Sequence, residues 1–156
     1  VRPTSTPSSG DTLVSDTTRA ILGAGTLVAL AATAGSLYFS LGLGLTPCDL
    51  CWYQRILMYP LVVVLGVAAV EGRGDVWKTV VPLSLGGVAL AGYHTYLQVT
   101  PGATCTVGGP CTSIQYTMLD GLVTIPRLSL VAFALLTLFS LGAARADASS
   151  DNMWVA

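Results

Sequence analysis

Two pairs of cysteines are the residues of this sequence with the clearest chemistry. Two residues separate Cys48 from Cys51, and five separate Cys105 from Cys111. A C-x-x-C spacing is more typical of an exchangeable bridge with a reactive thiolate than of a structural one. Closing the short ring between Cys105 and Cys111 would stabilise the fold by only about 2.4 kcal/mol. The first pair therefore predicts thiol–disulfide exchange, whereas the second is compatible with exchange and with a structural bridge.

The residues that flank the first pair favour a reactive thiol. Pro47 suits the first position of a helix, where its missing N–H costs nothing. The positive end of the helix dipole would then face the cysteines and favour thiolate. Arg55 follows Cys51 by one helical turn on the same face. An arginine inside a membrane helix is costly and indicates a functional site, although it can also extend its side chain to the interface.

A later apolar stretch contributes an imidazole and an amide. His94 and Gln98 are four residues apart and share a helical face. At the helical rise, His94 would lie about 7–8 Å below the outer end of its helix, a depth similar to that of Arg55. A cation, an imidazole and an amide at one level can donate hydrogen bonds to the carbonyl oxygens of a quinone head group. The alternative is a histidine that is simply hydrogen-bonded within a helix bundle.

The chain that must position these residues is strongly apolar. Of its 156 residues, 53% are hydrophobic and 10% are charged, with a mean hydropathy of +0.70, whereas an ordinary soluble domain carries about 25% charged residues. A net charge of −1 without a basic patch argues against a nucleic-acid partner. Four apolar stretches approach the roughly 20 residues that a membrane span needs. The expected spans are about 20–45, 49–70, 79–99 and 127–144.

The sequence thus predicts an all-α membrane protein, a bundle of four transmembrane helices with both termini in the cytoplasm. Five basic residues fall on the side of the termini and two on the other side, which sets this orientation. The membrane domain is expected over 19–145, between a disordered cytoplasmic tail at 1–18 and a cytoplasmic tail at 146–156. The first span lacks the features of a cleaved signal peptide and is expected to be a retained anchor. The loop 100–126 would be the outer, catalytic loop.

Both cysteine pairs would then lie on the extracytoplasmic face of the cell membrane, where disulfides persist. A zinc site made of all four cysteines is compatible with their spacing. The oxidising compartment and the absence of a zinc-ribbon context argue against it, and we expect no metal.

One segment closely resembles a known signature. Residues Cys48–Arg55 read CDLCWYQR and resemble the C-x-x-C-x-Y-Q/E-R motif of the disulfide bond formation protein B (DsbB) family. Tyr93–Gln98 is similar to the family's third-span segment, and Thr124–Leu130 to the entry of its fourth span. The close spacing of Cys105 and Cys111 resembles the short-loop branch of the family, since the best-known members space these cysteines widely.

The resemblance implies a membrane thiol:quinone oxidoreductase that reoxidises a DsbA-type partner of thioredoxin fold. The electrons would pass to ubiquinone or menaquinone, and the sequence does not distinguish the two. Cys51 would engage the quinone, with Arg55 stabilising it and His94 near its ring. Cys105 would form the mixed disulfide with the partner, and Cys111 would link transiently to Cys48. The oligomeric state stays open.

Two other classes of protein remain as alternatives. An enzyme of the vitamin K epoxide reductase type is also a membrane helix bundle with two cysteine pairs, but there the C-x-x-C follows the loop pair, whereas here it comes first. A non-enzymatic membrane protein with structural disulfides would not explain Arg55 one turn from Cys51.

Overall fold

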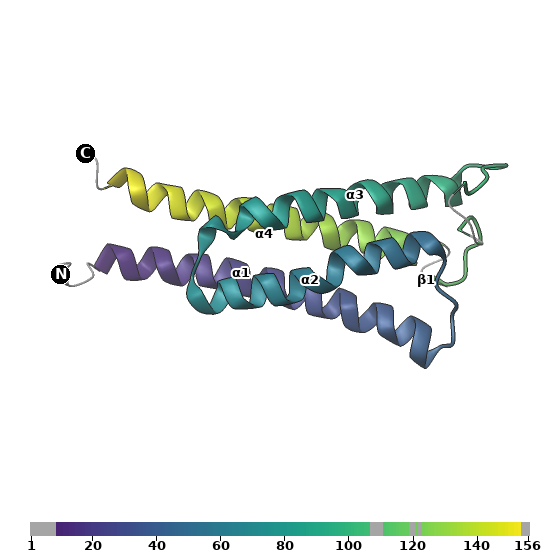
Figure 1. Cartoon of the computed structure of the whole chain (residues 1–156), viewed down its shortest axis with the longest axis horizontal. Coiled ribbons are helices and arrows are strands. Elements are labelled where there is room, and N and C mark those ends of the chain that lie inside the picture. Colours follow the sequence, from purple (N-terminus) through teal and green to yellow (C-terminus); the bar gives the residue numbers. More distant parts are fainter. Residues whose placement is uncertain (1–8, 107–110, 119–120, 122, 154–156) are drawn as a thin grey trace.

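The protein is a bundle of long helices with a small hairpin at one end (Figure 1). The structure is a computed structural model and describes residues 9–106, 111–118, 121 and 123–153. Its four long helices are α1 (Ser9–Leu37), α2 (Asp49–Glu71), α3 (Trp77–Val99) and α4 (Ile125–Met153). The start of α1 and the end of α4 lie at the same end of the bundle. The links that carry the cysteines lie at the other end.

Three of these helices are long and apolar enough to cross a membrane, over Ser15–Gly42, Asp49–Glu71 and Ile125–Ala148. α3 is as long as α2, with 23 residues, but Tyr93, His94 and Gln98 make its C-terminal part less apolar. Large apolar side chains on the outside of the bundle are exposed, among them Leu27, Val63, Val70 and Leu138. Exposed apolar surface on this scale is unusual in a soluble monomer and fits a multi-pass membrane protein.

Both end helices extend further than the sequence predicted. α1 begins at Ser9, so the expected disordered tail is wrong for 9–18, while residues 1–8 lie outside the described part. Thr18 is 1% exposed, and a Cβ added to Gly72 would lie 2.9 Å from Arg19 Nε. α1 therefore packs at Ser15 and Arg19 against the α2–α3 turn, which composition does not reveal. α4 likewise continues past Arg145 to Met153.

The turn between α2 and α3 is built around one glycine. Gly72 ends α2 in the left-handed region, with φ +70°, and its N–H donates to the Ala68 carbonyl. This conformation suits glycine because it has no Cβ. A 3₁₀ turn over Gly74–Val76 then leads into α3. The segment 71–78 is therefore the tight turn that its glycines predict.

The core of the bundle lies between α3 and α4 on one side and α1 and α2 on the other. Leu22, Leu61, Leu65 and Leu136 are fully buried there. Phe133 of α4 packs directly onto α3 at Gly87, where an added Cβ would fall 2.3 Å from its ring. Small residues at helix contacts allow such close approach in membranes.

The end that carries the cysteines is less regular. A π-helical segment, Tyr38–Gly42, follows α1, and this end of α1 leans away from the other helices (Figure 1). Between α3 and α4, β1 (Thr117–Met118) pairs antiparallel with β2 (Val123–Thr124). Phe39 packs against Tyr116 with ring centroids 4.9 Å apart, which ties the end of α1 to the link between α3 and α4.

Candidate active site

The C-x-x-C cysteines lie at the start of α2. Cys48 is the N-cap residue and Cys51 lies in the first turn, and their sulfur atoms are 2.9 Å apart. Pro47 precedes the N-cap and so lies two residues before the first helical position, Asp49, that the sequence assigned to it. The Cys48 carbonyl accepts a hydrogen bond from the Trp52 N–H at 3.1 Å. Both thiols are therefore held at the positive end of the α2 dipole.

The loop cysteines lie against the same site. Cys111 is 1% exposed and packs with Cys48, Leu50 and Leu97, while Cys51 and Cys105 are half-buried beside them. The Cys111 sulfur lies within hydrogen-bonding reach of the sulfurs of both Cys105 and Cys48. Sulfur contacts therefore run from Cys105 through Cys111 and Cys48 to Cys51. The structure joins none of the four in a disulfide.

The two inner thiols of this series hold their protons tightly. The pKa of Cys48 is raised to about 12, first because its S–H donates to Cys51 and then because it is buried. Burial raises the pKa of Cys111 to about 12 as well, and its contact with Cys105 adds to this. Neither is a thiolate at neutral pH, so exchange through them requires that a neighbouring group stabilise the anion or take the proton.

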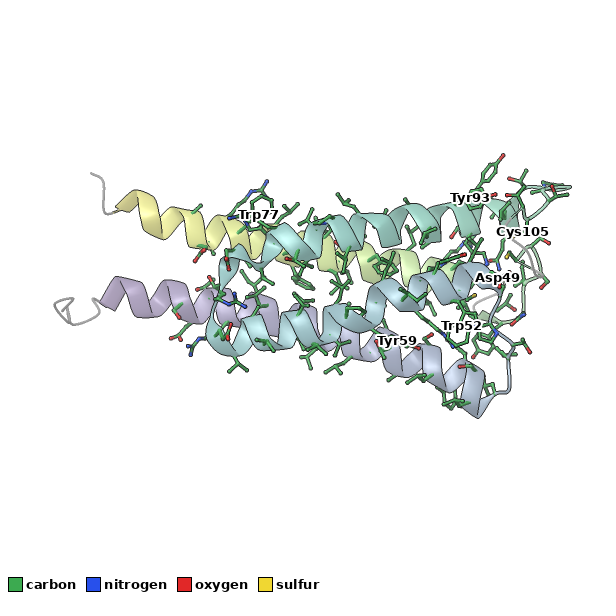
Figure 2. The ribbon with its side chains drawn as sticks, viewed as in Figure 1. Asp49, Trp52, Tyr59, Trp77, Tyr93 and Cys105 are labelled. Carbon is green, nitrogen blue, oxygen red and sulfur yellow. The ribbon has the colours of Figure 1, made fainter. Side chains whose placement is uncertain are left out.

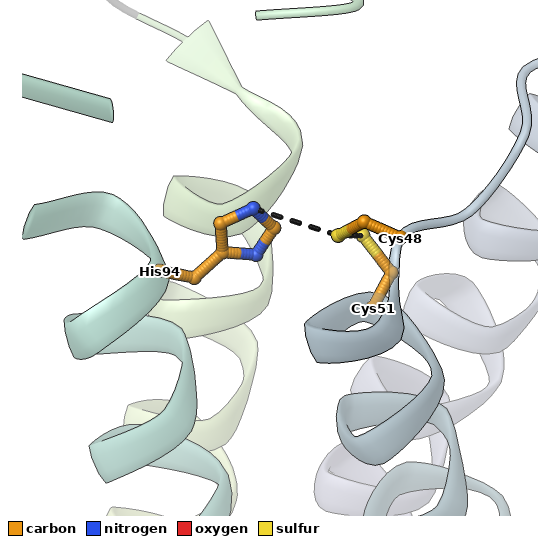
Figure 3. A group of neighbouring side chains, drawn as sticks. All are labelled: Cys48, Cys51 and His94. Carbon is orange, nitrogen blue, oxygen red and sulfur yellow. Dashed lines mark hydrogen bonds between the residues drawn. The ribbon is translucent and has the colours of Figure 1, made fainter. Parts of the chain in front are cut away.

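His94 is the group placed to do so at Cys48. Its ring comes from α3, is 3% exposed, and faces the two cysteines across the interior (Figure 3). His94 Nε2 lies 3.8 Å from Cys48 Sγ, and its Nδ1 lies 3.2 Å from Gln54 Nε2. An amide nitrogen only donates, so Nδ1 accepts and the ring proton sits on Nε2, beside the sulfur. This contact lowers the pKa of Cys48 against the larger effects that raise it.

Gln54 is a site residue that the sequence did not single out. It is 5% exposed and its amide sets the tautomer of His94. The only signal for it was the Q/E position of the signature, directly before Arg55.

Arg55 points toward α1 rather than toward the membrane surface. Its side chain is 9% exposed, which argues against a purely interfacial anchor. Arg55 Nε donates to Ser36 Oγ at 2.8 Å, and its terminal nitrogen donates to the Ser36 carbonyl at 2.8 Å and to Ser40 Oγ at 2.9 Å. The guanidinium also lies 5.2 Å from the Trp52 ring centroid. These partners are neutral, so the positive charge near Cys51 is not cancelled by them.

A cavity of about 60 Å³ opens between α1, α2 and α4 beside Cys51 and Arg55. It adjoins a larger apolar groove of about 320 Å³ between α1 and α4. Both are lined by Ala32, Ser36, Phe39, Ile125 and Ser129. The cavity beside Cys51 and Arg55 therefore shares one wall with the apolar groove between α1 and α4.

The structure separates Arg55 from the other two residues expected beside it. His94 and Gln98 line a second cavity, of about 20 Å³, on the other side of Cys51. Gln98 Nε2 donates to the Ser113 carbonyl at 3.5 Å and so contacts the link between α3 and α4. Cys51, Gln115 and Ile125 line both cavities, and of these three only Cys51 can take part in thiol–disulfide exchange.

The site lies at the level where the bundle would meet the membrane surface. Figure 2 shows Asp49, Trp52, Tyr93 and Cys105 at one end of the bundle and Trp77 toward the other. Trp52 and Tyr93 are 51% and 38% exposed. Aromatic residues of this kind gather at membrane interfaces.

Comparison with known proteins gives one family. Residues 18–143 match the model of "Disulfide bond formation protein DsbB". The chain is 46% identical over 117 residues to disulfide bond formation protein C of Bacillus subtilis (strain 168), covering 72% of this chain and 84% of that relative. It is 43% identical over 121 residues to a probable disulfide formation protein of Deinococcus radiodurans, covering 70% and 79%. No solved structure matched the chain.

The matched residues contain both cysteine pairs, Arg55 and His94. The sulfur contacts, the buried cation and the family match point the same way, and the resemblance read from the signature is confirmed. The chain belongs to the DsbB family of membrane-bound disulfide bond formation proteins.

Proposed function

We propose that this protein is a thiol:quinone oxidoreductase that reoxidises an extracytoplasmic, DsbA-type partner of thioredoxin fold. The observation that carries the proposal is the unbroken series of sulfur contacts from the half-buried Cys105 to Cys51. It ends beside a buried cation and a cavity that adjoins an apolar groove. Structural disulfides would need neither the contact between the pairs nor the cation.

The proposed topology has four spans, with both termini in the cytoplasm and the cysteines outside. α3 has the length of a span, about 35 Å at the helical rise, and packs within the bundle beside α4. The distribution of basic residues supports the orientation. The four cysteines then lie in an oxidising compartment.

Exchange in this scheme begins at the loop. A thiolate of the reduced partner attacks Cys105 of a Cys105–Cys111 disulfide, and Cys111 leaves. Cys111 then attacks Cys48 of a Cys48–Cys51 disulfide, which frees Cys51 as a thiolate. The second thiolate of the partner then attacks the partner's sulfur in the mixed disulfide, which releases the oxidised partner and frees Cys105 as a thiolate. Cys105 attacks Cys111 of the Cys48–Cys111 bridge and restores the loop disulfide, and Cys48 leaves as a thiolate. The proton on His94 Nε2 can stabilise Cys48 in this step, while its sulfur carries charge. Each step exchanges one sulfur–sulfur bond for another, so no net oxidation occurs within the chain.

The cavity beside Cys51 suits a quinone chemically. Arg55 and the hydroxyls of Ser36 and Ser40 offer a positive charge and hydrogen bonds, and the apolar groove between α1 and α4 suits an isoprenoid tail. A bound quinone would supply the acceptor for the two electrons and two protons released when the partner dithiol becomes a disulfide. Partners of the DsbA type have reduction potentials of about −120 mV. Only an acceptor with a higher potential, such as a quinone, can reoxidise them.

The test is an anaerobic assay with purified protein, a reduced thioredoxin-fold oxidant and a short-chain quinone. One quinol is expected for each partner disulfide formed. Cys105→Ser should abolish this turnover but retain bound quinone, whereas Cys51→Ser should abolish turnover by removing the residue next to the cavity. Partner oxidation without quinone consumption would refute the proposal, and loss of quinone from Cys105→Ser would refute the division of roles.

A further inference from the structure

Two thiols and an imidazole meet at the start of α2 in an arrangement that, besides serving disulfide exchange, offers three ligands to a metal ion. The sulfurs of Cys48 and Cys51 and one ring nitrogen of His94 all lie within 4.8 Å of one another (Figure 3). Cys48 is buried, His94 is 3% exposed, and Cys51 is half-buried. Buried sulfur and imidazole ligands on two packed helices are the donors that zinc prefers.

The distances suit a tetrahedral ion. With Zn–S near 2.3 Å and Zn–N near 2.0–2.1 Å, tetrahedral angles place two sulfurs about 3.8 Å apart and a sulfur and a nitrogen about 3.6 Å apart. Cys48 Sγ and His94 Nε2 are 3.8 Å apart. The two sulfurs are 2.9 Å apart and need to separate by about 1 Å, which a side-chain rotation of the half-buried Cys51 can provide.

We propose that the fully reduced protein binds one thiophilic divalent cation, with Zn²⁺ as the reference ion, through Cys48 Sγ, Cys51 Sγ and His94 Nε2. Binding displaces the two thiol protons to solvent and changes no oxidation state. Two thiolates balance the charge of the ion, which favours this set in a buried site. The site differs from the four-cysteine cluster that the sequence argued against, because it uses only the first pair and an imidazole from α3.

The redox state of the cysteines decides whether the site exists. A Cys48–Cys51 disulfide removes two of the three ligands, so the oxidised protein has no site. A cation bound to the reduced form would in turn keep both sulfurs from exchange. The site therefore makes the reduced protein sensitive to thiophilic metal ions, and this sensitivity does not depend on quinone.

Gln54 is placed to support the ion from behind the imidazole. In the metal-free tautomer its amide nitrogen faces His94 Nδ1 at 3.2 Å. A cation on Nε2 moves the ring proton to Nδ1, so the amide must turn over and present Oε1. The terminal amide torsion allows this, because it is broad and roughly two-fold. A carboxylate at this position would accept from Nδ1–H without turning, and such partners change metal affinity by about 10–100-fold.

The test uses Co²⁺ added to the purified, fully reduced protein in detergent under anaerobic conditions. Co²⁺ reports thiolate ligands through near-ultraviolet charge-transfer absorption and tetrahedral geometry through intense visible bands. We expect one Co²⁺ per chain, displacement by one equivalent of Zn²⁺, and no bands from the oxidised protein. Cys48→Ser and Cys51→Ser should abolish the charge-transfer band, and His94→Ala should weaken binding at least tenfold.

Matched variants separate this site from binding elsewhere. Cys105→Ser removes a thiol of the same cluster that is not a ligand and should keep affinity within about twofold, whereas Gln54→Glu should strengthen binding and Gln54→Leu weaken it by about 10–100-fold. Circular dichroism and elution volume establish that each variant is folded. The absence of a thiolate–cobalt band in the reduced protein, or equal binding by His94→Ala, would overturn the proposal. A loss in Cys105→Ser as large as that in Cys48→Ser would also overturn it.

Discussion

Cys48 is the residue at which the two cysteine pairs and the imidazole meet. Its sulfur contacts Cys51, Cys111 and His94. The spacing of the cysteines and the signature predict its part in exchange. The contact with His94 Nε2 depends on how α2 and α3 pack, so the sequence indicates both residues but not their pairing.

The protonation of Cys48 gives a prediction for the reduced protein. Its pKa is raised from 9.0 to about 12, so at neutral pH its thiolate fraction is about 1,000-fold below that of an ordinary thiol. Alkylation of Cys48 should be slow at pH 8 and should keep rising about tenfold per pH unit toward pH 12. Site-resolved mass spectrometry of alkylated protein measures this. A rate that levels off near pH 9 would show that the hydrogen bond to Cys51 and burial do not hold the proton.

Arg55 gives a second prediction at this scale. Lysine keeps the charge but loses the planar fork that reaches Ser36 and Ser40 together. Arg55→Lys should therefore raise the quinone KM about tenfold, equivalent to about 1.4 kcal/mol, and Arg55→Met should raise it further. Arg73→Met, an exposed arginine at the opposite end of the bundle, is the matched control and should leave the KM unchanged. An unaltered KM in Arg55→Met would reduce Arg55 to a structural role.

Side-chain partners mark the limit of what the sequence could predict at the site. Arg55 was identified because an arginine inside a membrane helix is costly and indicates a function, and because it lies one turn from Cys51. Ser36 and Ser40 were missed because their role depends on the way the end of α1 lies against α2. The same packing turns Arg55 away from His94, which helical depth alone could not reveal.

Some helix ends can be predicted from nearby residues, whereas others depend on tertiary packing. The bounds of α2 follow from Asp49 at its start and Gly72 at its end, since charge near the first turn and a left-handed glycine are local signals. The composition of the Ser- and Thr-rich segment before Arg19 did not predict that α1 begins at Ser9, and the contacts of Ser15 and Arg19 with the α2–α3 turn are tertiary.

The contact between α3 and α4 gives a prediction at the scale of elements. A Cβ on Gly87 would fall 2.3 Å from the Phe133 ring, so Gly87→Ala forces the helices apart or Phe133 out of its rotamer. Overpacking of this kind costs about 1–3 kcal/mol. Gly92→Ala lies on the same helix with nothing within 4 Å of the new Cβ and serves as control. Denaturant unfolding in detergent should show a lower midpoint for Gly87→Ala alone, and equal midpoints would contradict this packing.

The whole molecule separates its chemistry from its termini. The cysteine pairs lie at one end of the bundle, and the start of α1 and the end of α4 lie at the other (Figure 1). Composition and the apolar stretches predict the helical membrane class well, because membrane insertion depends mainly on length and hydropathy.

Orientation in the membrane gives the corresponding prediction. After mild reduction of intact cells, a membrane-impermeant thiol reagent should label the half-buried Cys105, because the loop faces outward. A cysteine introduced at exposed Asp75, in the α2–α3 turn at the other end, should react only after lysis. The reverse pattern would invert the proposed topology.

The path from partner to quinone depends on direct exchange between Cys111 and Cys48, and trapping that bond tests it most directly. In a Cys51→Ser, Cys105→Ser double variant only these two cysteines remain, and their sulfurs are in contact. Mild oxidation should close a Cys48–Cys111 disulfide, identified by mass spectrometry of the cleaved protein. The complementary Cys48→Ser, Cys111→Ser variant keeps only the outer members of the series and should form its bridge far more slowly. Failure to form the Cys48–Cys111 bridge, or equal rates in both variants, would contradict the proposed route of the electrons.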